Sequence, residues 1–294
     1  MTDRTRSRSV ALRRTLTLGT VLAGVAATGA AATGAGTALA ADGASAIILA
    51  QAEGEGGESG TEHRSTQIQA EGEGGEGGEG GEGGDALADP QQRLQRDLSF
   101  MEGHLRAGLA LYEAGDIEAA RTHMGHPIKE KYDAVAAPLE AMGKGMLRGQ
   151  IVAIAEAAEA GAPVSELRAA FDAARATMEE VRATIPPADQ VMGLAALTRV
   201  AGQEYAAAVE GGTVSNLHEY QDAWGFLRVV ETEARQMTES DDPDIAAAGR
   251  EILAHLEPTG TAFGDLQGKG SFTMDPSILM GAAARIEITG LGLI

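Results

Sequence analysis

Residues 94–116 read LQRDLSFMEGHLRAGLALYEAGD, and they carry a clear helical signal. The apolar residues of this stretch recur every three or four positions, which is the spacing of one face of an α-helix. A helix should end at Gly115, because glycine suits the left-handed position after a helix, and Asp116 suits the N-cap of the next helix. The stretch therefore predicts an antiparallel helical hairpin whose first apolar face is formed by Leu94, Leu98, Met101, Leu105, Leu109 and Tyr112.

The same helical spacing of apolar residues continues from about residue 89 to residue 257. It is rich in Ala, Leu, Glu and Arg, and glycine or proline interrupts it at intervals, as at 161–163, 186–187 and 242–243. We therefore predict an all-α fold, an antiparallel helical bundle of αα-hairpins, as one domain over residues 89–257. Residues 258–294 are more apolar and β-branched, and we expect a short helix and an extended tail that packs on the bundle.

The first 88 residues are of a different kind. Residues 1–40 combine five arginines and one aspartate with an apolar stretch and a run of small residues at 37–41, which predicts a secretory signal peptide. The pair Arg13-Arg14 fits a twin-arginine signal, and an ordinary Sec signal fits as well. Residues 41–88 hold Glu-Gly repeats that cannot bury apolar area, so we expect a disordered linker. The sequence thus predicts an exported, periplasmic protein.

Composition excludes several classes of function. The chain has no cysteine, which rules out disulfides, a thiol nucleophile, a cysteine zinc site and a c-type haem attachment. Its formal net charge of −20 argues against a nucleic-acid partner, because binding phosphates requires a basic surface. No segment after the signal has the ~20 consecutive apolar residues that a membrane-spanning helix needs. No enzyme motif such as a nucleophile elbow or a phosphate loop is present, so we predict that the protein is not an enzyme.

One cluster of residues carries metal-binding chemistry. Three of the six histidines, His104, His123 and His126, lie close together in the sequence beside Met101 and Glu130. His104 precedes Gly115 by 11 residues and His126 follows it by 11, so an antiparallel hairpin should bring them to the same height. Pro127 predicts a helix break at His126. These five residues form the predicted metal site.

The donor types leave the bound species open. Imidazole and carboxylate from His104, His126 and Glu130 would suit iron, zinc or manganese, whereas the thioether of Met101 or Met124 would favour copper. Haem held by His104 and a methionine is a further possibility. His218 and Asp222, one turn apart, would complete the site if their helix packs on the first hairpin. The alternative is that these histidines are structural, with His104 bonded to Asp97 or to a backbone carbonyl.

Two resemblances to known families suggest functions for the protein. The segment 109–120, LALYEAGDIEAA, looks like the helix-turn-helix joint of tetratricopeptide units, which implies a protein-interaction role. The signal peptide, the helical hairpins and the Gly103-His104 pair are similar to imelysin-like periplasmic proteins linked to iron uptake. That family's Gly-x-His-x-x-Glu signature is absent here, because Gly103 directly precedes His104 and Ala107 stands in place of the glutamate. The resemblance implies iron or copper handling outside the cytoplasm and assigns no residue.

Together these observations predict an exported helical protein that binds a transition metal, iron or copper, for uptake, delivery or storage. The metal ion would be its main partner, with an envelope protein as a second. The competing hypothesis is a non-enzymatic envelope scaffold or interaction module with structural histidines.

Overall fold

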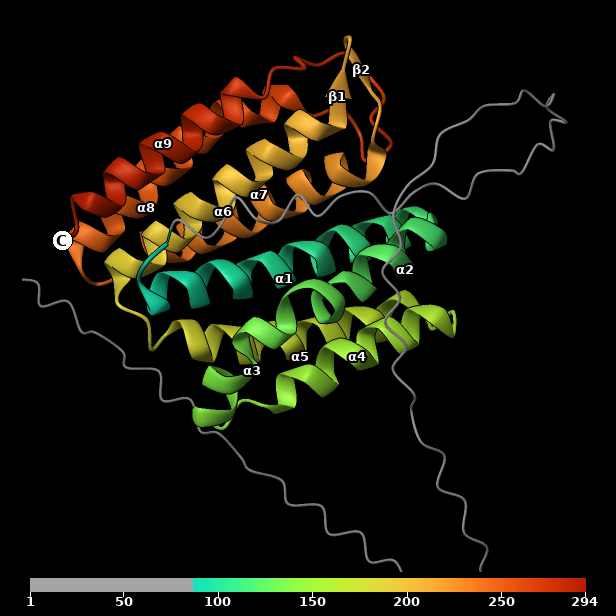
Figure 1. The fold of residues 1–294 in the computed structure, drawn as a ribbon, viewed down its shortest axis with the longest axis horizontal. Coiled ribbons are helices and arrows are strands. Elements are labelled where there is room, and N and C mark those ends of the chain that lie inside the picture. Colours follow the sequence, from blue (N-terminus) through green and yellow to red (C-terminus); the bar gives the residue numbers. More distant parts are fainter. Residues whose placement is uncertain (1–86) are drawn as a thin grey trace, which may run out of the picture. The chain divides into compact units, whose positions relative to one another are not determined.

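The computed structural model describes residues 87–294, and this part of the chain is mostly helical (Figure 1). The predicted all-α bundle is confirmed. The predicted signal peptide, and the predicted linker up to residue 86, lie outside the described residues. The elements, in chain order, are α1 Pro90–Ala114, α2 Ile117–His126, a π-helical segment Pro127–Lys131, α3 Tyr132–Ala141, α4 Met146–Glu159, α5 Val164–Arg182, α6 Pro187–Ala208, β1 Val209–Glu210, β2 Thr213–Val214, α7 Leu217–Thr238, α8 Pro243–Leu256, a 3-10 segment Glu257–Ala262 and α9 Ser277–Leu291.

Both ends of α1 follow from local chemistry. Asp89 is the N-cap, and its carboxylate accepts a hydrogen bond from the Gln91 backbone N–H at 2.7 Å. At the other end Gly115 adopts φ 87°, and its N–H and that of Asp116 donate to the carbonyls of Tyr112 and Leu111. This is the Schellman pattern, which satisfies carbonyls that the helix end would leave unpaired. The turn predicted at Gly115, with Asp116 as the N-cap of α2, is therefore confirmed.

The predicted helix break at Pro127 takes a different form. His126 keeps helical angles, φ −61° and ψ −42°, and the chain passes directly from α2 into the π-helical segment. The N–H of Tyr132 reaches back five residues to the carbonyl of Pro127, so the helix widens instead of stopping. His126 and Glu130 consequently stay on one continuous helical path.

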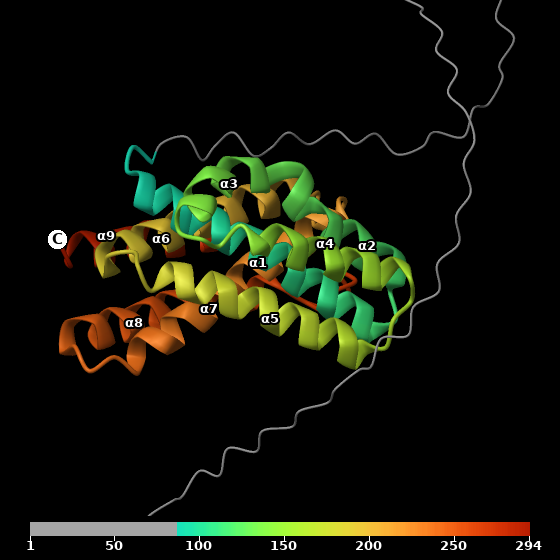
Figure 2. The same cartoon turned by 90° about the horizontal axis from the view of Figure 1, so that it is seen from below.

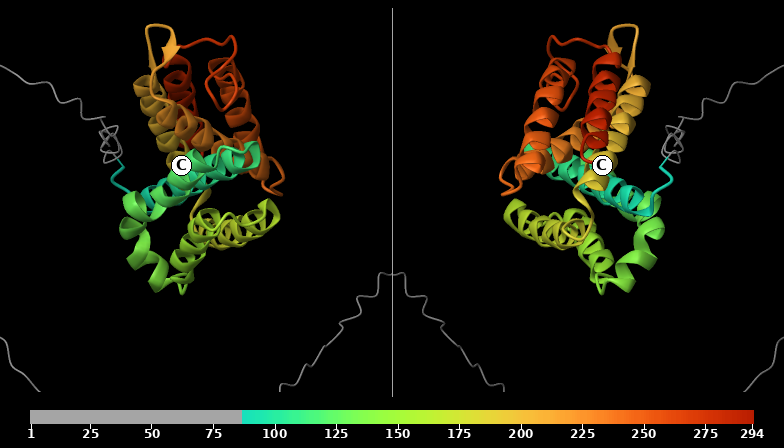
Figure 3. Two further views of the ribbon diagram at one scale, coloured as in Figure 1. Left: turned by 90° about the vertical axis from the view of Figure 1, so that its right-hand side faces the viewer. Right: turned by 90° about the vertical axis from the view of Figure 1, so that its left-hand side faces the viewer.

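Two apolar clusters lie on opposite sides of α1. One is built mainly from α6 to α9 and the other from α1 to α5. In Figure 1 the α6–α9 group and the α2–α5 group flank α1, and the views in Figure 3 show the same two layers end-on. Figure 2 shows the hairpin of α4 and α5 from below. Because α1 contributes side chains to both clusters, it joins the two layers into one bundle.

The backbones of α1 and α7 approach each other closely at two glycines. A Cβ placed on Gly225 would lie 2.4 Å from the carbonyl oxygen of Gly103, and one placed on Gly103 would lie 2.4 Å from the ring of Phe226. Only the absence of both side chains allows the two backbones to come this close. This close approach puts the residues that flank the two glycines in contact across the helix pair.

The C-terminal segment completes the layer formed by α6 to α9. After the 3-10 segment the chain runs without regular structure to α9, which packs against α6 and α8. Helix α9 extends to Leu291, so the helical part of the predicted tail is longer and the extended part shorter than expected. Within residues 87–294, no helix combines the length and the apolar character needed to cross a membrane.

The α1–α7 contact makes a direct prediction for Gly225→Ala. The added methyl group would meet the Gly103 carbonyl, so the two helices must separate or bend. We expect the free energy of unfolding to fall by roughly 1–3 kcal/mol or more, as overpacked cores show. Chemical denaturation followed by circular dichroism measures this change.

Gly149→Ala is the matched control. Gly149 is also in a helix, α4, but it is exposed and a Cβ there would meet nothing within 4 Å. This variant should be more stable than the natural chain by about 0.5–1 kcal/mol, because alanine loses less backbone entropy than glycine. Equal stability of the two variants would show that the α1–α7 approach is not as close as described.

Candidate metal centre

Four histidines and two carboxylates converge where α1, α2, the π-helical segment and α7 meet. Three overlapping groups of these residues have ligand atoms that lie within 4.8 Å of one another. The rings of His104 and His126 have centroids 5.3 Å apart, in line with the equal spacing of the two residues from Gly115. The groups are His104, His123 and Asp222; His104, His126 and Glu130; and His126, His218 and Asp222.

Asp222 is the carboxylate that the buried histidines share. Its Oδ1 lies 2.6 Å from His104 Nδ1 and 2.9 Å from His123 Nδ1, and its Oδ2 lies 3.5 Å from His218 Nε2. Burial by itself raises the pKa of Asp222, but the charges of His104 and His123 and the hydrogen bond with His123 lower that pKa far below its usual range. Asp222 therefore stays ionised and provides a fixed negative charge inside the bundle.

His104 is the histidine best suited to take a ligand. It is only 2% exposed, with Phe100 and Phe226 packed edge-on against its ring. Although Nδ1 is 2.6 Å from Asp222, neither ring nitrogen makes a contact with hydrogen-bond geometry. A buried polar atom without a partner is costly. The residues around His104 fit a metal ion, because an ion would supply the partner that the protein does not.

His123 has a different environment. The Gln221 amide nitrogen donates to the Leu266 carbonyl at 2.9 Å, so its oxygen faces His123 Nε2, also at 2.9 Å. Both ring nitrogens of His123 thus face acceptors. Burial lowers the pKa of His123, but the Asp222 charge and the hydrogen bonds that Asp222 and Gln221 accept from the ring raise it more. We interpret His123 mainly as the residue that positions Asp222.

The solvent-facing side of the cluster consists of His126, His218 and Glu130, which are all partly exposed. His126 Nδ1 lies 2.9 Å from Glu130 Oε1, and His104 Nε2 lies 3.5 Å from Glu130 Oε2. Burial raises the pKa of Glu130, but its hydrogen bond with His126 and the charges of His104 and His126 lower that pKa by more than burial raises it. Burial lowers the pKa of His218, which favours a neutral imidazole with a free lone pair. An ion would reach the buried donors through these three residues.

Glu204 and Glu219 belong to the same region and were not predicted. Burial, a hydrogen bond with Glu219 and the charges of Asp222 and Glu130 raise the pKa of Glu204 to about 9. Glu204 is on α6, and no local pattern in α6 marks it, because only the packing of α6 on α7 brings it there. The four neighbouring carboxylates repel one another and favour a bound cation. Without a metal ion, a proton on Glu204 reduces this repulsion. The four residues are Glu130, Glu204, Glu219 and Asp222.

Met101 does not share this environment. It is fully buried in the apolar cluster of the α1–α5 layer, as is Met124. Of the five predicted ligands, the structure brings together the three histidines and Glu130, and it places Met101 among apolar side chains. His104 contacts Asp222, not Asp97, which pairs with Arg96 instead. The sequence predicted that His218 and Asp222 would join the site if their helix packed on the first hairpin. Helix α7 packs there, and both residues are in the cluster.

Residues 183–287 match the family model of the iron permease-associated 4-helix bundle domain. No curated protein and no solved structure matches the chain. The matched residues, less than half of the chain, cover α6 to α9 and include His218 and Asp222. His104, His123, His126 and Glu130 lie outside the match, so the cluster forms where helices outside the matched segment pack on it.

The shifted pKa of Glu204 predicts a pH-dependent effect of Glu204→Gln. A carboxyl whose pKa rises from 4.5 to about 9 on folding binds more protons in the folded state. In the metal-free chain its contribution to the free energy of unfolding therefore falls as pH rises through this window. Glutamine lacks this proton equilibrium, so the variant should gain stability relative to the natural chain at pH 8 but not at pH 4. Denaturation at both pH values measures the difference.

Glu210→Gln is the control, since Glu210 is an exposed glutamate in the short β-hairpin nearby in sequence. It should show no such pH-dependent gain. A gain of equal size in both variants would instead reflect the overall negative charge of the chain.

Proposed function

We propose that this protein is an exported metal-binding protein that takes up iron at the four-histidine cluster and passes it on to a permease, without catalysing a reaction. One observation carries the proposal: four histidines from α1, α2 and α7 meet at Asp222 and Glu130, mostly away from solvent. The similarity of residues 183–287 to an iron permease-associated domain supports iron as the cargo.

The donor atoms support iron over copper. Imidazole nitrogen and carboxylate oxygen are borderline to hard donors, which suit iron, whereas the thioethers that would favour copper belong to the apolar core. First-row metals compete for any such site, and Cu²⁺ commonly binds the same donors more tightly. Selection for iron would then depend on the metal available outside the cytoplasm. The signal peptide predicted for residues 1–40, with Arg13-Arg14, supports that location.

The arrangement also supports reversible binding. His104 and Asp222 hold a fixed inner position, while His126, His218 and Glu130 are open to solvent and can exchange an ion. The surplus of carboxylates around the cluster attracts a cation, and the protons held there in its absence are released when it binds. These properties fit delivery better than permanent storage.

The first prediction of this proposal concerns metal content. The full chain, purified without chelators and titrated with Fe²⁺, should bind near-stoichiometric iron by elemental analysis and calorimetry. The His104→Ala/His126→Ala variant should lose this iron, because each of the three donor groups contains at least one of these residues.

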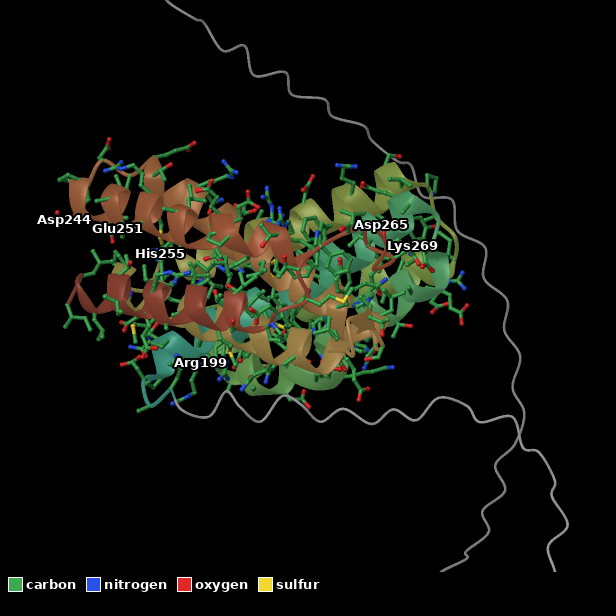
Figure 4. The ribbon with its side chains drawn as sticks, turned by 90° about the horizontal axis from the view of Figure 1, so that it is seen from above. Arg199, Asp244, Glu251, His255, Asp265 and Lys269 are labelled. Carbon is green, nitrogen blue, oxygen red and sulfur yellow. The ribbon has the colours of Figure 1, made fainter. Side chains whose placement is uncertain are left out.

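His255→Ala is the control. His255 is on α8, near the end of the molecule opposite the Asp265–Lys269 loop (Figure 4), and it belongs to none of the donor groups. It should retain the iron. If the natural chain binds neither iron, zinc nor copper, the cluster is structural and the proposed function is wrong.

A second prediction separates the charge of Asp222 from its shape. Asp222→Asn keeps the size of the side chain but removes the negative charge that the histidines share. We expect iron affinity to fall roughly tenfold or more, since a neutral amide is a much weaker ligand. The pKa of His123, followed by NMR, should fall as well, because the Asp222 charge no longer opposes the effect of burial. An unchanged His123 pKa would contradict the described contact.

A further inference from the structure

A second feature of the bundle is an arginine-lined groove on the other side of the α1–α7 pair. Helices α5 and α7 both pack on α1, and the groove between them has a volume of about 480 Å³. In Figure 1, α1 lies between the other two helices. Its lining residues include five arginines, two aromatic side chains and three carboxylates, and the arginines are Arg106, Arg168, Arg175, Arg228 and Arg235.

The arginines form two facing rows. Arg168 and Arg175 are seven residues apart on α5, and Arg228 and Arg235 are seven apart on α7. Seven residues are two helical turns, so each pair is on one face of its helix. Arg106 contributes a fifth guanidinium from α1. This spacing gives the groove positive charge on both walls and along its floor.

The carboxylates in the groove do not use up the donors of these arginines. Arg228 and Arg235 share one carboxylate, that of Glu231, at 2.8 and 2.6 Å. Arg168 pairs with Glu113, and Arg175 is 3.6 Å from Glu179, which is outside the groove. The Nε atoms of Arg175 and Arg228 are buried and have no hydrogen-bond partner, so a ligand would contact the terminal nitrogens of these side chains. Within the lining, five arginines therefore face three carboxylates, those of Glu113, Asp172 and Glu231. Two further carboxylates outside the lining pair with Arg106 and Arg175: Glu102, at 2.7 Å, and Glu179.

The aromatic residues complete the groove. The Arg228 guanidinium stacks 5.6 Å from the Trp224 ring, and that of Arg106 is 5.7 Å from the Phe171 ring. Such stacking holds the planar guanidinium groups in place and leaves their edges available. Guanidinium edges bind carboxylate and phosphate oxygens in pairs, which is the strongest form of charge-assisted hydrogen bond.

We propose that this groove binds a small polyanion that carries two or more carboxylate or phosphate groups. The lining holds five arginines and three carboxylates, although the chain as a whole has a formal charge of −20. A volume of this size accepts a small organic molecule. The proposal uses none of the donor residues of the metal centre and stands independently of it.

The chain contains its own probe, because Trp224 is its only tryptophan and lines the groove. Citrate and pyrophosphate, titrated separately into the full metal-free chain, should change the Trp224 fluorescence in a saturable way, and calorimetry should give the same affinity. Saturation by citrate alone identifies a carboxylate ligand, and saturation by pyrophosphate alone a phosphate ligand. No saturable change with either anion at millimolar concentration overturns the proposal.

Two double variants locate the binding. Arg168→Gln/Arg228→Gln should weaken binding at least roughly tenfold, because two charge-assisted contacts are lost. Arg121→Gln/Arg199→Gln removes the same charge outside the groove and should change the affinity less than about twofold. Arg199 and Arg228 are both 38% exposed and each pairs with a glutamate, which makes the comparison fair. Equal losses in the two variants would contradict a built site.

The His104→Ala/His126→Ala variant separates this proposal from the proposed function. It should bind the anion as well as the natural chain does, even though its iron is lost. Anion binding that disappears with these histidines would mean that citrate or pyrophosphate reaches the metal centre, and the groove would then have no role. Circular dichroism of every variant shows whether the fold is intact.

Discussion

The close approach of α1 and α7 at Gly103 and Gly225 is the constraint on which the rest of the structure depends. Two helix backbones come this near only where neither carries a side chain. His104 directly follows Gly103, and Asp222 lies about one helical turn before Gly225. The two residues therefore meet across the helix pair, with His104 Nδ1 2.6 Å from Asp222 Oδ1. The candidate metal centre is formed by an α1 histidine and an α7 carboxylate that helix packing, and not a flexible loop, holds together.

The same helix pair carries a second set of buried charges on the other side of the glycines. Arg182 from α5 lies 2.6 Å from Glu102 on α1 and 3.3 Å from Glu233 on α7, and Ser99 donates to Glu233 at 2.7 Å. Separating any of these partners would leave an unpaired buried charge, which is strongly unfavourable. The network thus requires α1, α5 and α7 to pack in one register, and that register sets both the histidine cluster and the arginine groove.

The two charged sites have opposite character. The cluster around Asp222 gathers carboxylates and histidines, so it favours a cation, and a raised pKa keeps Glu204 protonated where no cation is bound. The groove between α5 and α7 gathers guanidinium groups and favours an anion. Helices α1 and α7 contribute to both.

Local patterns were enough to predict the helical class, the end of α1 at Gly115, the N-cap Asp116 and the meeting of His104 with His126. These features depend on residues near one another in the sequence, where helical periodicity and turn chemistry apply. The π-helical passage at Pro127 was not predicted, because proline alone does not reveal whether a neighbouring turn can widen. The burial of Met101 in the apolar core, the contact of His104 with Asp222, the role of Glu204 and the facing rows of arginines were decided by which helices pack together. His104 and Asp222, for example, are 118 residues apart in the sequence, and no periodicity within one helix specifies which face of another helix it will meet.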